Sequence, residues 1–193
     1  MRINIKRSLL FLVMMTVITV SYTALVTLVA EFLWTDKAHG LILTDTGGRT
    51  IGSCLIGQEF TSPKYFHGRP SSVSWNAAAS GASNFAPSDS RLAELVKSRA
   101  VALGGNEILN LPADLLLASG SGLDPHISKT AAEFQVERVA LERGMEKEDL
   151  LAIMAKHVEP LAWQVFGRER VNVLLLNADL DKIEFKGDGE NIP

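Results

Sequence analysis

Serine, histidine and aspartate residues gather in one short segment of this chain, residues 118–128, which reads ASGSGLDPHIS. These are the side chains of a hydrolase triad, in which a histidine oriented by an acid activates a hydroxyl nucleophile. The candidates are Ser119 or Ser121, His126, and Asp124 or Asp114. Neither serine lies in the Gly-x-Ser-x-Gly turn that exposes the nucleophile in many hydrolases. We therefore expect no catalytic residue here. We expect His126 to hydrogen-bond neighbouring backbone, and Asp124 to cap a turn rather than bind a metal.

The same segment has the composition of a shaped loop. Gly120 and Gly122 allow backbone angles that other residues avoid, and Pro125 fixes one φ angle. A flexible linker would repeat Gly and Ser without the Leu-Asp-Pro-His ending. The pattern favours a loop positioned for contact, and the alternative is a simple connection between two elements. The predicted contact residues are Ser119, Gly120, Ser121, Gly122, Asp124, Pro125 and His126.

Composition limits what this loop can belong to. The chain has 193 residues, 47% of them hydrophobic, which is enough for one domain with a sizeable core. A net charge of -3 gives no electrostatic reason to expect a nucleic-acid partner. The single cysteine, Cys54, excludes an intramolecular disulfide and a cysteine-based zinc site. We expect no metal site.

An uncharged apolar run extends from Ser8 to Ala30. At about 1.5 Å per residue a helix of this length spans roughly 35 Å, enough to cross a hydrocarbon core of about 30 Å. A cleaved signal peptide has a shorter apolar region and a small-x-small exit. The sequence therefore predicts an uncleaved transmembrane helix over residues 8–33.

Flanking charge predicts the orientation of this helix. Arg2, Lys6 and Arg7 precede the apolar run, whereas the first basic residue after it is Lys37, next to an aspartate. Basic residues are retained on the cytoplasmic side of a membrane. Residues 1–7 are therefore expected in the cytoplasm, and everything after Trp34 is expected outside it.

Threonines recur at three- and four-residue spacing along one face of the predicted helix, at Thr16, Thr19, Thr23 and Thr27. Small hydroxyl residues on one stripe let another helix approach closely and form weak interhelical hydrogen bonds. This spacing predicts a docking face for a partner helix. In the alternative, each hydroxyl bonds a carbonyl of its own helix and faces lipid.

Beyond the anchor the sequence predicts one α+β domain over residues 34–181 and a flexible tail over 182–193, charged and frayed from Asp179 onward. The expected elements are a hairpin of 41–46 and 50–56 turning at Gly47-Gly48, a long loop over 57–86, a helix from Ser88 or Asp89 to Leu103, a helix over 129–143 with Ser128 as N-cap and Gly144 as stop, a helix over 147–157, and a buried strand over 171–177. Long loops inside compact domains are usually functional.

Five segments in this order closely resemble the C subunit of Kdp-type potassium-transporting ATPases. They are GSCLIGQEF at 52–60, YFHGRPS at 65–71, SGASN at 80–84, the loop at 118–128, and QVERVA at 135–140. The resemblance extends from the anchor to about Asp181. The chain departs from it at Ala82 and Ala86, where the family typically has glycine, and at Phe85, where it has leucine, which would stiffen that loop.

The resemblance implies a single-pass accessory subunit of a bacterial potassium uptake complex in the inner membrane, with a potassium-channel-like subunit and a P-type ATPase subunit as partners. This chain has no Asp-Lys-Thr-Gly phosphorylation motif and no phosphate-binding loop, and one helix cannot enclose an ion pathway. It is therefore expected not to be an enzyme by itself. The alternative is a membrane-tethered extracytoplasmic domain that binds a ligand or hydrolyses a substrate.

The family is also described as a catalytic chaperone that raises the affinity of the ATPase subunit for nucleotide. By this resemblance Ser53, Gly57 and Gln58 would contact ATP. The orientation predicted from charge places them outside the cytoplasm, where ATP is scarce, and we give that orientation more weight. No stably bound cofactor is expected, and ATP would act through the ATPase subunit.

Residues 65–75 contain further candidate contact residues. Arg69 could clamp an acidic partner surface through its planar guanidinium, or could be a solvated loop residue. Tyr65, Phe66 and Trp75 could be interface anchors or cover for the core. The sequence leaves both alternatives open.

Overall fold

The computed structural model describes residues 2–45, 47–104, 108–160 and 167–189. The chain divides into two compact units, Met1–Ile42 and Leu43–Pro193. The predicted class, an N-terminal apolar helix followed by an α+β domain, is confirmed.

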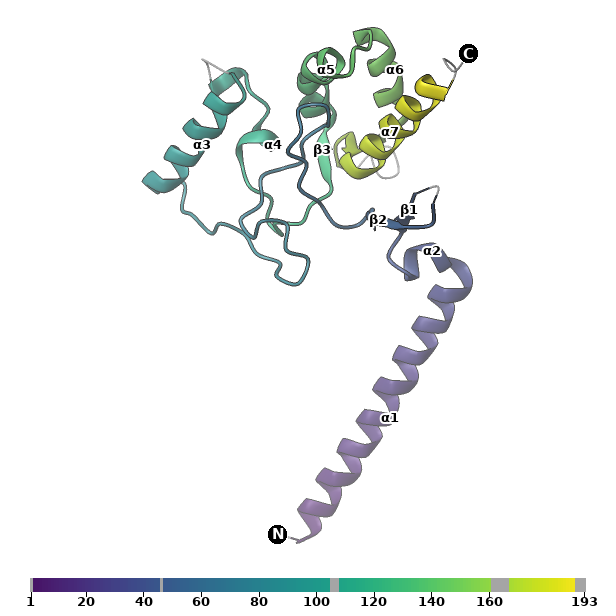
Figure 1. The fold of residues 1–193 in the computed structure, drawn as a ribbon. Coiled ribbons are helices and arrows are strands. Elements are labelled where there is room, and N and C mark those ends of the chain that lie inside the picture. Colours follow the sequence, from purple (N-terminus) through teal and green to yellow (C-terminus); the bar gives the residue numbers. More distant parts are fainter. Residues whose placement is uncertain (1, 46, 105–107, 161–166, 190–193) are drawn as a thin grey trace. The chain divides into compact units, whose positions relative to one another are not determined.

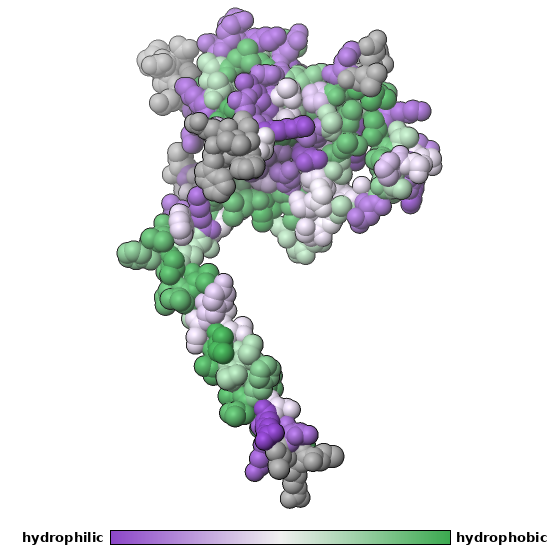
Figure 2. Space-filling model, turned by 180° about the vertical axis from the view of Figure 1, so that it is seen from behind, coloured by the Kyte–Doolittle hydropathy of each residue, from purple (hydrophilic) through white to green (hydrophobic). Residues whose placement is uncertain are grey.

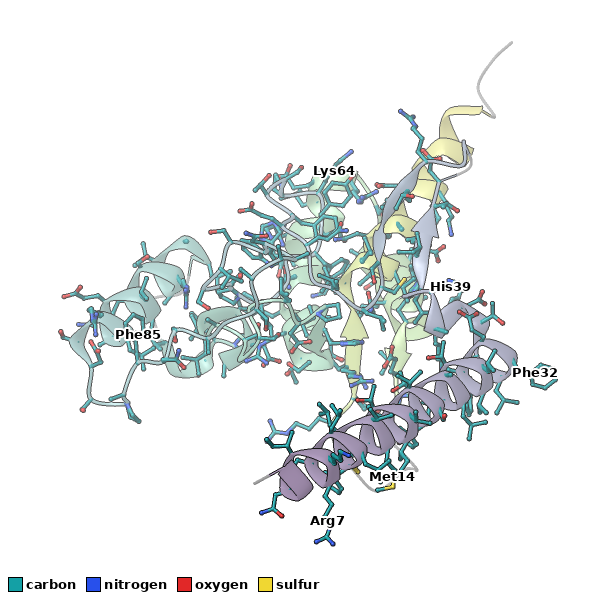
Figure 3. All side chains as sticks on the ribbon, turned by 90° about the horizontal axis from the view of Figure 1, so that it is seen from below. Arg7, Met14, Phe32, His39, Lys64 and Phe85 are labelled. Carbon is teal, nitrogen blue, oxygen red and sulfur yellow. The ribbon has the colours of Figure 1, made fainter. Side chains whose placement is uncertain are left out.

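The first unit consists of helix α1, Arg2–Leu33, and the single turn α2, Thr35–Ala38. Residues Asn4–Leu33 are long and apolar enough to cross a membrane, and an 18-residue window within them has a mean hydropathy of 2.3. Figure 2 shows this helix largely in the green of hydrophobic residues. Its side chains are exposed all round, and Phe32 projects from its end (Figure 3) with 87% of its surface accessible. Such a helix requires an apolar environment.

The second unit carries two small sheets. Strands β1, Ile42–Thr44, and β2, Thr50–Ser53, form the predicted hairpin with shorter strands than expected. The other sheet has the order β3-β5-β4 and is antiparallel, with β3 at His126–Ser128, β5 at Arg170–Asn172 and β4 at Val158–Glu159. This second sheet fixes the end of the loop at 118–128.

Most predicted helices and caps are confirmed. Helix α3 is Ser90–Ala102, and its N-cap Asp89 accepts a hydrogen bond from the Arg91 N–H. Helix α5 is Lys129–Arg143, with Ser128 accepting from the Ala131 N–H and Gly144 ending it at a φ of 62°. Helix α6 is Lys147–Lys156, and the turn α4 at Ala113–Leu116 was not predicted. In Figure 1, β3 lies between α4 on one side and α7 on the other.

The core forms around α5, which contributes Val136 and Val139, both fully buried. The core also includes Phe66, Ile127, Leu150, Val171, Leu176 and Leu180. The predicted loop over 57–86 is confirmed, and the stretch without helix or strand extends over residues 54–89, yet Phe66 lies in this core. The long loop is therefore an integral part of the fold.

The predicted strand at 171–177 is wrong. Strand β5 ends at Asn172, and helix α7 runs from Val173 to Gly189. Asn172 Oδ1 accepts a hydrogen bond from the Leu175 N–H at 3.2 Å, as an N-cap residue does. A short apolar run fits a strand or a buried helix equally well by periodicity alone. Leu176 and Leu180, four residues apart, lie on the buried face of the helix.

The expected fraying from Asp179 onward is also wrong, because helix α7 includes Asp179 and Asp181. Asp179 pairs with His157 at 3.2 Å, and Asp181 pairs with Arg143 at 3.0 Å. These pairs hold α7 to α5 and to His157, the residue that follows α6. The flexibility of the predicted tail over 182–193 stays a prediction, and residues 190–193 lie outside the described part of the chain.

Candidate functional site

The loop at 118–128 is held by segments that are distant in the sequence. Its backbone accepts hydrogen bonds at Ser121, Gly122 and Leu123. The donors are Gly81 N and Ser80 Oγ to Ser121 O, Ser71 Oγ to Gly122 O at 2.7 Å, and Gly57 N to Leu123 O at 2.7 Å. In addition, the Ser119 N–H donates to Pro70 O at 3.1 Å. Four of the five segments that carry the resemblance therefore meet at this loop.

Close approach of other atoms explains two of the glycines in this cluster of loops, but not a third. Gly122 has a φ of +69°, and a Cβ there would lie 2.6 Å from Val73 Cγ2 and 2.8 Å from Gly81 O. A Cβ on Gly57 would lie 2.6 Å from Asp124 O. Gly120 does not have a positive φ, and a Cβ on it would meet nothing within 4 Å. The backbone freedom that both glycines allow is therefore used at Gly122 and not at Gly120.

No hydrolase triad forms among these side chains. Ser119 is 3% exposed, and Ser121 Oγ accepts a hydrogen bond from the Leu123 N–H at 3.1 Å. The ring of His126 faces carboxylates instead: Nδ1 lies 3.5 Å from Asp124 and Nε2 lies 3.6 Å from Glu159. The expectation that the His126 side chain bonds backbone is therefore wrong. The capping role predicted for Asp124 is confirmed, because its Oδ1 accepts from the His126 N–H at 3.0 Å.

Two aspartates line the outer edge of strand β3. Asp124 accepts from the His126 N–H, and Asp114 Oδ2 accepts from the Ser128 N–H at 2.9 Å. Arg69 joins the two carboxylates, with Nη1 3.3 Å from Asp124 and Nε 3.8 Å from Asp114. Side chains that occupy the edge of a sheet prevent unwanted strand pairing there. Arg69 therefore has acidic partners within its own domain, while its predicted role as a clamp for a partner stays a prediction.

These groups line an open groove of about 1230 Å³. Its charged members are Arg69, Asp114, Asp124, His126, Lys129, Glu133, Arg168, Glu169 and Arg170. Both signs of charge line the groove, and Lys129 pairs there with Glu169 at 3.2 Å. Burial raises the pKa of Asp124, but the hydrogen bonds from His126 and the charge of Arg69 outweigh it, so this pKa lies below its usual value. Asp124 is therefore ionised at neutral pH.

Polar groups of Ser53, Gly57 and Gln58 form hydrogen bonds within the chain. Ser53 Oγ accepts from the Leu55 N–H at 3.1 Å, and Gln58 Nε2 donates to Ile51 O at 3.3 Å. Gly57 is buried, with its N–H bonded to the loop at 118–128. The donors that the resemblance offers to a nucleotide thus already have partners within the chain. The nucleotide contact itself stays a prediction.

Side chains that were not among the predicted site residues hold the loop at 63–71 in place by hydrogen bonds. Asn177 exchanges two hydrogen bonds of 2.9 Å with the backbone N–H and C=O of Phe66. Gln135 does the same for His67, at 2.8 and 3.0 Å. Arg138 donates to the carbonyls of Pro63 and Tyr65. The sequence offered one indication of these contacts. Gln135 lies on the buried face of a predicted helix, and a buried polar side chain requires a hydrogen-bond partner.

The aromatic residues of the same loop differ in their environment. Phe66 is fully buried, so it belongs to the core rather than to an interface. Tyr65 is partly buried, and its hydroxyl donates to Asp181 at 3.1 Å. Trp75 is half-buried and has a φ of +51°. The interface roles predicted for Tyr65 and Trp75 stay predictions.

The threonine stripe lies on α1, and two of its hydroxyls bond their own helix. Thr16 Oγ1 donates to Leu12 O at 2.9 Å, and Thr23 Oγ1 donates to Thr19 O at 2.8 Å. Bonds of this kind fit the alternative interpretation, in which each hydroxyl bonds a carbonyl of its own helix and faces lipid. They are equally compatible with contact to a neighbouring helix. The docking role predicted for Thr16, Thr19, Thr23 and Thr27 stays a prediction.

Comparison with known proteins places this chain in a well-populated group. A family model described as "KdpC: K+-transporting ATPase, c chain" matches residues 5–182. The chain is 46% identical over 181 residues to the potassium-transporting ATPase KdpC subunit of Dechloromonas aromatica, covering 90% of this chain and 94% of the relative. The subunit of the same name from Koribacter versatilis is 43% identical, with 91% and 95% covered. That of Herpetosiphon aurantiacus is 42% identical, with 95% and 98% covered.

Proposed function

Because the chain belongs to the KdpC family of potassium-transporting ATPase subunits, it is a component of a potassium uptake complex, and we propose that it acts there by contact rather than by catalysis. In this proposal it is an accessory and assembly subunit. It stabilises the complex and supports ATP binding and hydrolysis by the P-type ATPase subunit. Its other partner is the channel-like subunit that carries potassium.

One observation carries this proposal: the loop at 118–128 is fixed in shape by three distant segments and forms no hydrolase triad. Ser71, Gly81 and Gly57 hold its carbonyl groups. His126 faces two carboxylates instead of a serine hydroxyl. A preorganised surface loses little conformational entropy when a partner binds, which favours a docking role.

We further propose that the domain lies outside the cytoplasm and α1 anchors it in the inner membrane. The charge bias around the apolar helix supports this orientation. Its effect on nucleotide affinity then passes through the ATPase subunit, without direct contact between ATP and Gly57 or Gln58. A reporter that is active only in the cytoplasm, fused after Pro193, should be inactive. Activity of that reporter would refute the orientation and revive direct nucleotide contact.

The accessory role is tested on the purified complex. Potassium-stimulated ATPase activity should be lost when the chain is omitted and restored when it is added back. The chain alone should hydrolyse neither ATP nor model ester and peptide substrates. Full activity without the chain would refute the proposal, and hydrolysis by the chain alone would favour the tethered hydrolase instead.

The threonine face of α1 is proposed to contact a partner helix within the membrane. Replacing Thr19 and Thr23 together by leucine should reduce co-purification of the other subunits, because bulky side chains hold the helices apart. Leu25→Ile, which keeps the side-chain volume, is the control and should have no effect. Equal co-purification of both variants would show that the hydroxyls serve only their own helix.

A further inference from the structure

Only a small part of the surface of helix α3 packs against the rest of its domain. Of its residues Ser90–Ala102, Ala100 is buried, while Leu95 and Val101 are 37% and 75% exposed. Figure 1 shows α3 at one edge of the domain, next to α4. An amphipathic helix with so little intramolecular cover is suited to contact with another chain.

A groove of about 390 Å³ runs between α3 and the loop at 71–85. Leu92, Leu95 and Arg99 line it from one face of the helix, and Phe85 lines it from the loop. Phe85 lies beside α3 in Figure 3. The remaining walls are Ser71, Ser72, Ala82, Ser83 and Ala118. We call this the Arg99 groove.

Arg99 is the single charged residue of the groove, and it has no acidic partner among the described residues. Its Nη1 donates to Leu116 O at 2.6 Å, which holds the guanidinium in place. Burial lowers the pKa of Arg99, with no neighbouring carboxylate to oppose it. By contrast, Arg91 on the same helix pairs with Asp89 at 2.7 Å. A partly buried arginine without a counter-ion is complementary to a carboxylate.

We propose that the Arg99 groove binds an aspartate or glutamate side chain of another subunit of the potassium-transporting complex. The planar guanidinium would hold the carboxylate, while Phe85, Leu92 and Leu95 would contact the apolar groups around it. These apolar walls suit a side chain on a protein better than a fully hydrated inorganic anion. The partner is sought among the complex subunits because the chain belongs to a subunit family. This groove adjoins the loop at 118–128, because Ala118, the first residue of that loop, forms part of its wall.

The proposal is tested with a photo-cross-linking residue, benzoylphenylalanine, in place of Leu95 in the full chain, expressed together with the other subunits. Irradiation should yield a cross-link to another subunit, and the peptide captured should contain Asp or Glu. Arg99→Gln should reduce the yield at least fivefold. Lys97→Gln, which removes an exposed positive charge on the same helix, should change the yield less than twofold.

Val101, exposed on the same helix but outside the groove, supplies the positional control, because a cross-linker there should give a much weaker product. If the Arg99→Gln variant does not accumulate in the cell, the proposal is still tested by the sequence of the peptide that cross-links to the chain with Arg99 intact. A peptide without an acidic residue would overturn the proposal. So would no cross-link, a cross-link to a second copy of this chain, or a yield independent of Arg99.

Discussion

Replacing Gly122 by valine tests how the loop at 118–128 depends on its backbone geometry. Gly122 has a φ of +69°, where an L residue is destabilised by about 1–2 kcal/mol. Its new Cβ would lie 2.6 Å from Val73 Cγ2 and 2.8 Å from Gly81 O, both below any ordinary contact distance. Relieving such overpacking costs about 1–3 kcal/mol.

Together these effects predict that Gly122→Val lowers the free energy of unfolding by about 2–5 kcal/mol. For a domain of this size that corresponds to a fall in Tm of about 4–20 °C. The loop should also separate from Gly81 and Ser71, so potassium-stimulated ATPase activity of the complex should fall with it. Thermal unfolding of the full chain in detergent and ATPase assays of the complex measure the two effects.

Gly120→Val is the matched control, because it places the same side chain two residues away in the same loop. A Cβ on Gly120 meets nothing within 4 Å, and its φ is not positive. This control should change Tm by less than about 2 °C, as ordinary surface substitutions do. If both variants unfold at the same temperature, the close approach at Gly122 does not govern the stability of the loop.

Three further substitutions give distinct expected outcomes. Ser121→Ala should leave most potassium-stimulated ATPase activity, because the His126 ring faces Asp124 and Glu159 and does not act as a base on the Ser121 hydroxyl; complete inactivation with normal assembly would revive catalysis. Asn177→Leu should lower the free energy of unfolding by about 2–5 kcal/mol in denaturant titrations, since it leaves the buried N–H and C=O of Phe66 unpaired; a loss below about 1 kcal/mol would contradict this. Asp179→Asn should reduce the acid sensitivity of stability. Burial raises the pKa of Asp179, but His157 and Lys182 lower it below 3.8 overall, so its ionised form stabilises the fold above that pH and this stabilisation is lost as pH falls. The difference in Tm between wild type and Asp179→Asn should therefore shrink from pH 5 to pH 3, and a constant difference would refute the linkage.

Local sequence determines the anchor and several helix ends. The apolar run before Glu31 requires no tertiary partner to become a helix, because its own backbone bonds satisfy it in a membrane. Helix α5 likewise begins and ends where Ser128 and Gly144 predict, since a cap is decided by the few residues around it. The order of motifs also determined the family, which the comparisons confirmed.

Tertiary structure decides the rest, as residues 171–189 illustrate. Their apolar run fits a strand or a helix, and the choice depends on Asn177 reaching Phe66 and on Asp181 reaching Arg143. The sequence likewise cannot distinguish Gly120 from Gly122, because the difference lies in which atoms of residues 73 and 81 approach them. Arg69 lies in a predicted loop and Arg99 in a predicted helix, and neither position shows from sequence which groups the guanidinium meets. Only the fold gives Arg69 two aspartates and leaves Arg99 without one among the described residues, because such pairings depend on segments that meet in space after being far apart in the chain.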